Sequence, residues 1–155
     1  WSVDASGEAA KVKAGANTPM VRLFTVAKRA EAAPVADQRD LKHFGTWAEA
    51  SPTNVGGFSA VAYHFGQHLQ KNLPGNVAIG VIHTSWGGTP AQAWTSAEAL
   101  AADPALKYYA DAAKATTGKV NQNSGAALYN AMIHPLLPFA VKGAIWYQGE
   151  SNAGK

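Results

Sequence analysis

The fold is decided by a short apolar run, Val77-Ala78-Ile79-Gly80-Val81-Ile82, and by the residues on either side of it. A continuous apolar run of this length predicts a strand that is buried on both faces, as strands of a parallel sheet are. Pro74-Gly75 separates the run from the preceding segment. Residues 83–90 follow the run, and because they are rich in Gly, Ser and Thr we expect them to form a loop.

The segment before this strand, residues 58–73, is predicted to form an amphipathic helix. Its expected apolar stripe consists of Phe58, Val61, Ala62, Phe65, Leu69 and Leu73. Ser59 is the expected N-terminal cap. His64 and His68 lie four residues apart on the polar face, a spacing that can hold a metal ion. Because no Glu follows His64 and no third ligand is evident, surface positions are the simpler interpretation.

Two more apolar runs, 21–26 and 143–148, are predicted strands. Between them lie three helix signals: a capping box at 95–98, an Asp-Pro start at 103–104, and a helical stretch at 126–133. The order along the chain is strand, helix, strand, helices, strand. This order predicts an α/β fold in which helices cover the faces of a mainly parallel sheet.

The composition is that of a globular domain with a sizeable core, since 47% of the 155 residues are apolar. No apolar stretch reaches the length of a membrane span. The net charge is only +3, and no basic run is longer than Lys28-Arg29. We therefore expect neither a nucleic-acid nor a membrane partner. The chain has no cysteine, which excludes disulfides, thiolate metal sites and a thiol nucleophile.

Two of the predicted strands lead into loops with unusual polar groups. Residues 83–89 contain Gly87-Gly88, and residues 148–152 contain Gln148 and Glu150. The carboxyl ends of parallel strands meet at one edge of a sheet, where α/β proteins bind ligands. Backbone N–H groups at Gly87-Gly88 can stabilise an oxyanion, and the Gln148 amide can add a donor. A tight turn is the simpler interpretation of the two glycines, and the loop lacks the Lys and the spacing of a phosphate-binding loop.

Four stretches together carry a resemblance to a known family. They are 58–63 (Phe-Ser-Ala-Val-Ala-Tyr), 79–89 (Ile-Gly-Val-Ile through Ser-Trp-Gly-Gly-Thr), 128–136 (Leu-Tyr-Asn-Ala-Met-Ile with Pro-Leu) and 146–152 (Trp-Tyr-Gln-Gly-Glu-Ser-Asn). In order and spacing the chain resembles the sialate O-acetylesterases and related carbohydrate esterases of the SGNH hydrolases. The last stretch is the most specific of the four.

This resemblance implies a three-layer α/β/α sandwich of the SGNH-hydrolase, flavodoxin-like type. It also implies a serine esterase that hydrolyses acetyl esters on sugars through a Ser-His-Asp acyl-enzyme mechanism, with no metal ion or cofactor. Gly88 and Gln148 would form the oxyanion hole, with Glu150 in support. An O-acetylated sugar or glycan would be the substrate. The resemblance further suggests a periplasmic or secreted protein.

The family's nucleophilic Ser lies in a Gly-Gln-Ser-Asn-Met-Glu-Trp stretch, and Trp1 matches its last residue. The Asp-x-x-His motif that supplies the rest of the triad would follow Lys155. We therefore expect residues 1–155 to be the central portion of one catalytic domain, truncated at both ends. Its partner would be the remainder of the parent polypeptide, and the isolated chain is expected to be inactive.

Other interpretations of the same residues stay open. Glu150 either orders the active-site loop or is a carboxylate satisfied by local donors. Trp86, Gly87 and Trp94 are candidate substrate-binding residues, although the two tryptophans could also simply pack under their loop. A carbohydrate-binding module without catalytic activity would use Trp47, Trp86 and Trp94 equally well. A nucleotide-binding α/β domain is a weaker alternative, because the required glycine spacing and acidic ribose ligand are missing.

Overall fold

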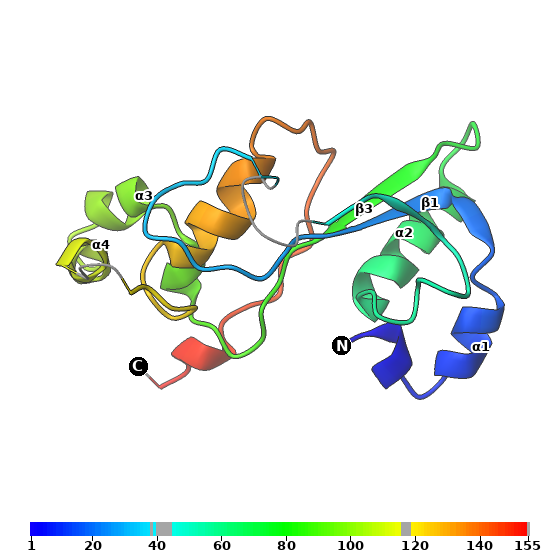
Figure 1. The fold of residues 1–155 in the computed structure, drawn as a ribbon, viewed down its shortest axis with the longest axis horizontal. Helices are drawn as coiled ribbons and strands as arrows, with labels where there is room; N and C mark the ends of the chain where they lie inside the picture. Colours follow the sequence, from blue (N-terminus) through cyan, green and yellow to red (C-terminus); the bar gives the residue numbers. More distant parts are fainter. Residues whose placement is uncertain (38, 40–44, 116–118, 155) are drawn as a thin grey trace. The chain divides into compact units, whose positions relative to one another are not determined.

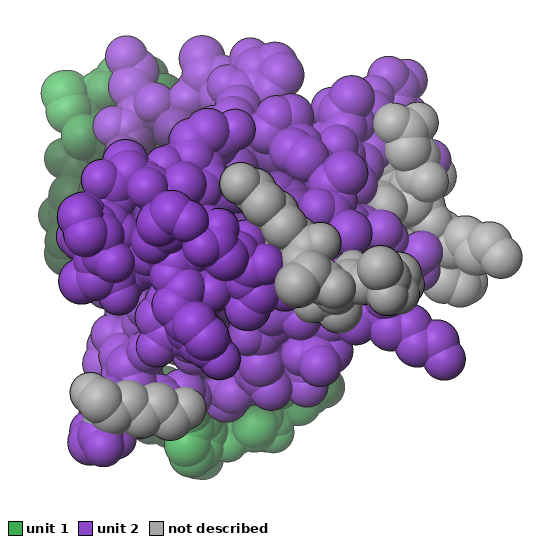
Figure 2. All heavy atoms as spheres, turned by 90° about the vertical axis from the view of Figure 1, so that its left-hand side faces the viewer, with its two compact units in different colours: residues 1–26, 45–83 green, residues 27–44, 84–155 purple. Residues whose placement is uncertain are grey.

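The computed structural model describes residues 1–37, 39, 45–115 and 119–154. The chain divides into two compact units, which Figure 2 shows in different colours. Unit 1 comprises Trp1–Val26 and Gly45–His83, and unit 2 comprises Ala27–Phe44 and Thr84–Lys155. None of the helices in the described part of the chain combines the length and apolar character needed to cross a bilayer.

Unit 1 is built on a three-stranded mixed sheet with the strand order β2-β1-β3 (Figure 1). The central strand β1 (Thr18–Thr25) pairs in parallel with β3 (Ile79–His83). On its other side β1 pairs antiparallel with the short strand β2 (Ala48–Ala50). The predicted strands at 21–26 and 77–82 and their parallel orientation are therefore confirmed, but the burial predicted for the second is wrong, since only Val81 of β3 is buried and Val77 is 49% exposed. Strand β2 was not predicted, because it lies in a segment without periodic features.

The predicted helix is also present, as α2 (Ala60–Asn72). The Ser59 hydroxyl caps it by accepting a hydrogen bond from Ala62 N at 3.3 Å. The predicted buried face is only partly right: Phe58 and Ala62 of the expected stripe are buried, but its other large members are not. Ala62, Tyr63 and Gly66 are buried, whereas Val61 is 63% exposed and Phe65 is 41% exposed. The helix is thus rotated relative to the expected stripe.

Gly66 explains this rotation. A Cβ atom placed at Gly66 would clash with Val81 Cγ2 of β3 and lie 3.6 Å from Val21 Cγ1 of β1. The small residues of α2 therefore face the sheet and let the helix approach it closely, which buries more apolar surface than a bulky contact would. On the opposite face of the sheet, Gly80 leaves room for the Trp47 ring, whose Cη2 would be 3.1 Å from an added Cβ.

The remainder of unit 1 completes one core. Two short helices, η1 (Val3–Ala5) and α1 (Ala9–Ala14), precede β1. The buried residues form a continuous apolar cluster of Val3, Ala16, Val21, Leu23, Ala50, Val55, Phe58, Ala62, Tyr63 and Val81. The sheet is therefore covered by helices and by the segment between β2 and α2.

Unit 2 is helical in its described residues. It contains η3 (Ala91–Trp94), α3 (Ala97–Ala102) and α4 (Lys107–Ala115). The helix start predicted at 95–98 is confirmed, and its cap is the Ser96 hydroxyl, which accepts from Ala99 N at 3.1 Å. The Asp103 carboxylate accepts from Ala105 N at 2.8 Å just before α4. These helices pack around Leu100, with the small residues Ala110 and Ala126 beside it.

The predicted helical stretch at 126–133 is present and ends in two irregular turns, the π-helix η4 (Tyr129–Ile133) and the 3-10 helix η5 (His134–Leu136). The buried Asn130 ties this stretch to residues 31–35, since its Nδ2 donates to Glu31 O at 3.0 Å and its backbone carbonyl accepts from Val35 N at 2.9 Å. His134 Nδ1 lies 2.9 Å from Val35 O. His134 therefore has the structural role of holding this segment.

The strand predicted at 143–148 is absent. Residues 143–149 have no regular secondary structure, and residues 137–147 are all exposed. A strand needs a neighbouring backbone to complete its hydrogen bonds, and no described segment pairs with this one. The fold is therefore α/β, and the sheet in the described residues is small and mixed rather than mainly parallel.

Candidate functional site

The first loop of the predicted site follows β3 and turns sharply at Gly87-Gly88. Both glycines are exposed, and Gly88 has a φ of +75°, a conformation that favours glycine. An added Cβ at either position would meet no heavy atom within 4 Å. The turn therefore exposes backbone rather than packing it, which is the condition a ligand-contacting N–H group requires.

Thr89 stabilises this loop through its side chain. It is buried, with 5% of its surface exposed. Its hydroxyl donates to Trp86 O at 2.6 Å and accepts a hydrogen bond from Trp94 Nε1 at 2.8 Å. These two bonds close the turn around Gly87-Gly88 and fix its shape.

The candidate substrate-binding residues Trp86 and Trp94 are both hydrogen-bonded to Thr89, and both are half-buried. Trp94 contributes its indole N–H to Thr89, so at least that edge of the ring has a structural role. The Trp86 ring has Lys28 Nζ at 5.9 Å from its centroid, within range of a cation–π interaction. Trp47, the third aromatic residue considered, lies in unit 1 and packs on Phe24 with a centroid distance of 5.3 Å.

The second loop carries the predicted amide and carboxylate. Gln148 is half-buried, and Gly149 has a φ of +136°, which turns the chain into the 3-10 helix η6 (Glu150–Asn152). Gln148 Nε2 donates to Thr89 O at 2.9 Å. The side chain predicted to join the Gly-Gly loop is therefore in direct contact with it, across 59 residues of sequence.

Asn152 adds a second connection between the two loops. Its Oδ1 accepts from Ala91 N at 2.8 Å, and its Nδ2 donates to Gln92 Oε1 at 2.9 Å. Together with the Gln148 bond, these contacts dock residues 148–152 on residues 89–92. The sequence predicts that the two loops lie together as the ends of two strands. In the structure, residues 143–147 do not form a strand, and the side-chain hydrogen bonds of Gln148 and Asn152 hold the two loops together instead.

Thr89 and Asn152 are the residues that the sequence analysis missed. Both belong to the motif stretches 79–89 and 146–152, in which only Trp86, Gly87, Gly88, Gln148 and Glu150 are predicted to have roles. The available signal was a short polar residue close to each loop's functional group: Thr89 directly follows Gly88, and Asn152 lies four residues after Gln148. Short polar side chains at such positions commonly bond to nearby backbone.

Glu150 faces its own loop rather than the Gly-Gly turn. Its own backbone N–H donates to the carboxylate, the Tyr147 hydroxyl donates as well, and together these bonds lower the pKa of Glu150. The same interaction raises the pKa of Tyr147, because the phenol is held as a donor to a carboxylate. Both groups are exposed. Local donors therefore satisfy the carboxylate, as in the second of the two interpretations of Glu150.

Candidate metal ligands do not cluster in the described part of the chain, where no group of three or more His, Asp or Glu side chains is suitably placed. His64 and His68 are exposed on α2, as expected for surface residues.

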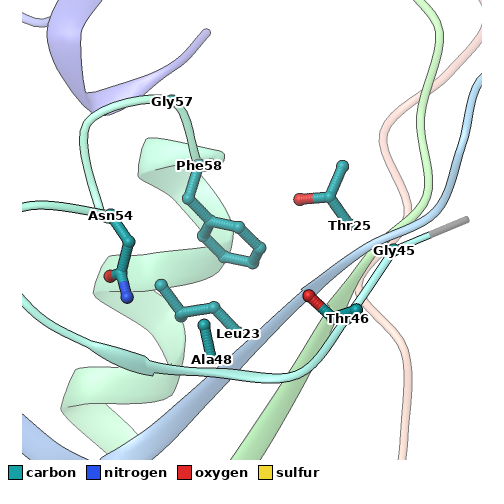
Figure 3. A pocket seen from close by; sticks show the side chains of 8 residues that line it. All are labelled: Leu23, Thr25, Gly45, Thr46, Ala48, Asn54, Gly57 and Phe58. Atoms are coloured by element: carbon teal, nitrogen blue, oxygen red, sulfur yellow. The ribbon is translucent and has the colours of Figure 1, made fainter. Parts of the chain in front are cut away.

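A hollow of about 170 Å³ lies in unit 1. It is lined by Leu23, Thr25, Gly45, Thr46, Ala48, Asn54, Gly57 and Phe58. Figure 3 shows Phe58 and Leu23 next to each other, with the Thr25 side chain across from them. The hollow contains none of the predicted site residues, which all belong to unit 2.

Comparison with known proteins identifies the family. The family described as carbohydrate esterase, sialic acid-specific acetylesterase, matches residues 17–155. The chain belongs to this family. The sialate O-acetylesterase of Homo sapiens is 41% identical over 111 residues, covering 68% of this chain and 20% of the relative. The sialate O-acetylesterase of Rattus norvegicus is 30% identical over 162 residues, covering 86% and 29%.

A solved structure supports the same assignment for this esterase-family chain. The carbohydrate acetylesterase of Xanthomonas citri is similar, with a TM-score of 0.77, 35% sequence identity and coverage of 98% of this chain. The chain spans 30% of that protein and between 20% and 29% of the two curated relatives above. The resemblance inferred from the four motif stretches is thus confirmed.

Proposed function

We propose that this chain is part of a carbohydrate O-acetylesterase and that it supplies the groups that stabilise the oxyanion. The observation that carries the proposal is the hydrogen bond of 2.9 Å between Gln148 Nε2 and Thr89 O. A primary amide has two N–H groups, so Gln148 retains a second donor while the first is bound beside the Gly87-Gly88 turn. Family membership supports this function over a non-catalytic carbohydrate-binding module.

The proposed reaction is acyl transfer from an acetyl ester on a sugar. A Ser hydroxyl attacks the acetyl carbonyl, a His removes its proton and later protonates the leaving sugar oxygen, and an Asp orients the His. Water then hydrolyses the acetyl-enzyme. These three residues lie outside this chain in our proposal, within the remainder of the parent polypeptide. Gly88 N–H and the Gln148 amide hold the negative oxygen of the tetrahedral intermediate.

The substrate is proposed to be an O-acetylated sialic acid or a related acetylated glycan. The names of the curated relatives, sialate O-acetylesterases, support this substrate class. Trp86 and Trp94 are both hydrogen-bonded to Thr89 in this loop, and aromatic side chains of this kind suit sugar rings. Glu150 supports the site by ordering the loop between Gln148 and Asn152.

We also propose that the complete enzyme contains a larger, mainly parallel sheet between two helical layers. Residues 143–148 would then become one of its strands. The exposed apolar side chains of Ile145 and Trp146 support this, because a buried strand is where such residues normally occur. A crystal structure of the complete enzyme would decide it, and solvent-exposed coil at 143–148 there would contradict it.

Steady-state kinetics of Gln148→Ala in the complete esterase tests the proposed function. The donor acts on charge that exists mainly in the tetrahedral state, so kcat should fall by about 10²–10³ while KM changes little. Gln148→Glu should be at least as harmful, because it places a carboxylate beside the forming oxyanion. A thermal melt controls for folding. Near-normal kcat with an unchanged melt would show that Gln148 is structural and would make Glu150 the better candidate.

A further inference from the structure

Three hydrogen bonds link the two loops of the site into one unit, and one residue makes two of them. Asn152 accepts from Ala91 N at 2.8 Å and donates to Gln92 Oε1 at 2.9 Å, using both ends of its amide. Gln148 makes a third bond, to Thr89 O. Within the second loop, Asn152 N donates to Gly149 O at 2.9 Å and closes the turn that joins Gln148 to Asn152.

This arrangement determines where the Gln148 amide lies. Residues 148–152 carry no regular structure before η6, and the preceding residues 137–147 are exposed, so their own packing does not fix the position of Gln148. The bond from Gln148 to Thr89 alone leaves the backbone of the loop free to pivot about one point. Asn152 lies four residues after Gln148. Its two hydrogen bonds attach the loop at a second point and so prevent this pivoting.

We propose that Asn152 is a positioning residue for Gln148. It docks residues 148–152 on 89–92 and thereby holds the Gln148 amide plane so that its second N–H points to the position of the oxyanion. This inference rests on the proposed function for its catalytic consequence, but the docking itself does not depend on activity. Asn152 makes no contact with Gly87 or Gly88 among the described hydrogen bonds, so it acts only through the loop.

The chemistry of the Asn152 side chain allows a rescue experiment. Asn152→Ala removes both bonds and should free the loop. Asn152→Asp keeps the acceptor for Ala91 N, and Gln92 can rotate its amide to donate to the second carboxylate oxygen, because a Gln amide has a donor and an acceptor at nearly equivalent positions. The Asp variant should therefore keep most of the docking, and Asn152→Asp combined with Gln92→Ala, which keeps only the bond from Ala91 N, should give a result between those of Asn152→Asp and Asn152→Ala.

The first measurement is the NMR signal of the Gln148 side-chain amide in the 155-residue chain. In the unsubstituted chain, one Nε2 proton is hydrogen-bonded and the other is not, so the two resonances should be well separated. In Asn152→Ala they should move together towards the values of a free amide, and in Asn152→Asp they should stay apart. Asn123→Ala, which changes an exposed asparagine of the same unit, is the matched control and should leave them unchanged.

The second measurement is kinetics in the complete esterase. Misplacing the donor by about 1 Å should lower kcat of Asn152→Ala by about tenfold to a hundredfold, with KM within about twofold. Unchanged Gln148 resonances in Asn152→Ala would overturn the proposal, as would Asn152→Ala and Asn152→Asp having equal kcat. If the unsubstituted esterase hydrolyses no acetyl ester, the proposed function fails, while the NMR result still decides the positioning role.

Discussion

At the scale of single residues, the site depends on short polar side chains that make two bonds each. Thr89 binds Trp86 and Trp94 through one hydroxyl, and Asn152 binds Ala91 and Gln92 through one amide. Such residues satisfy buried backbone groups at little entropic cost, because they have few rotatable bonds. Gly88, a proposed oxyanion donor, is left exposed at the turn.

The interaction between Tyr147 and Glu150 leads to a prediction about pH. Glu150 has a lowered pKa, so its interactions stabilise the fold above the ordinary pKa of the carboxyl, and this contribution is lost as the pH falls through the lowered value. Tyr147→Phe removes one of the two donors. We expect the pKa of Glu150 to rise towards its ordinary value but to stay below it, because the backbone donor, the larger cause, remains.

A titration of the Glu150 carboxyl by ¹³C NMR measures this effect. Tyr108→Phe, which alters another exposed tyrosine of unit 2, should leave the Glu150 titration unchanged. If Tyr147→Phe also leaves it unchanged, the phenol does not donate to Glu150.

At the scale of secondary structure elements, the contact between α2 and the sheet is the most sensitive point of unit 1. Gly66 is where the helix approaches Val81 and Val21 most closely. We expect Gly66→Ala to destabilise the fold by about 1–3 kcal/mol, the usual cost of overpacking a core, even though alanine is the better helix former. Urea denaturation compares it with Gly57→Ala, where an added Cβ would meet nothing within 4 Å. Equal stability of the two variants would show that α2 can shift away from the sheet.

The elements also show what the sequence can and cannot predict. The parallel pair β1–β3 and the helix between them were predicted, because apolar runs and helical spacing are local signals. The buried face of α2 was predicted only in part, since the spacing of apolar side chains says nothing of how closely Gly66 lets the helix approach the sheet. The strand at 143–148 was predicted from its apolar residues, but pairing is a non-local property and no described segment supplies it. For the site, the motif located Gly88 and Gln148, whereas the roles of Thr89 and Asn152 depend on contacts across about 60 residues.

At the scale of the whole molecule, the chain corresponds to 30% or less of the length of the relatives described above. In our proposal it contains oxyanion donors but neither the nucleophile nor the base. We therefore expect the 155-residue chain to show no esterase activity against p-nitrophenyl acetate above the uncatalysed rate. Rapid hydrolysis that survives both Ser85→Ala and Ser151→Ala would show that the catalytic groups have been assigned wrongly.

The exposed segment 137–147 has a practical consequence for work with this polypeptide. Its large apolar side chains include Leu137, Phe139 and Trp146, and the last of these is 66% exposed. Patches of this kind favour self-association and bind hydrophobic dyes and chaperones. During purification, the 155-residue chain should therefore be retained on a phenyl-substituted column and should enhance the fluorescence of anilinonaphthalene sulfonate, and it will be handled most easily at low concentration.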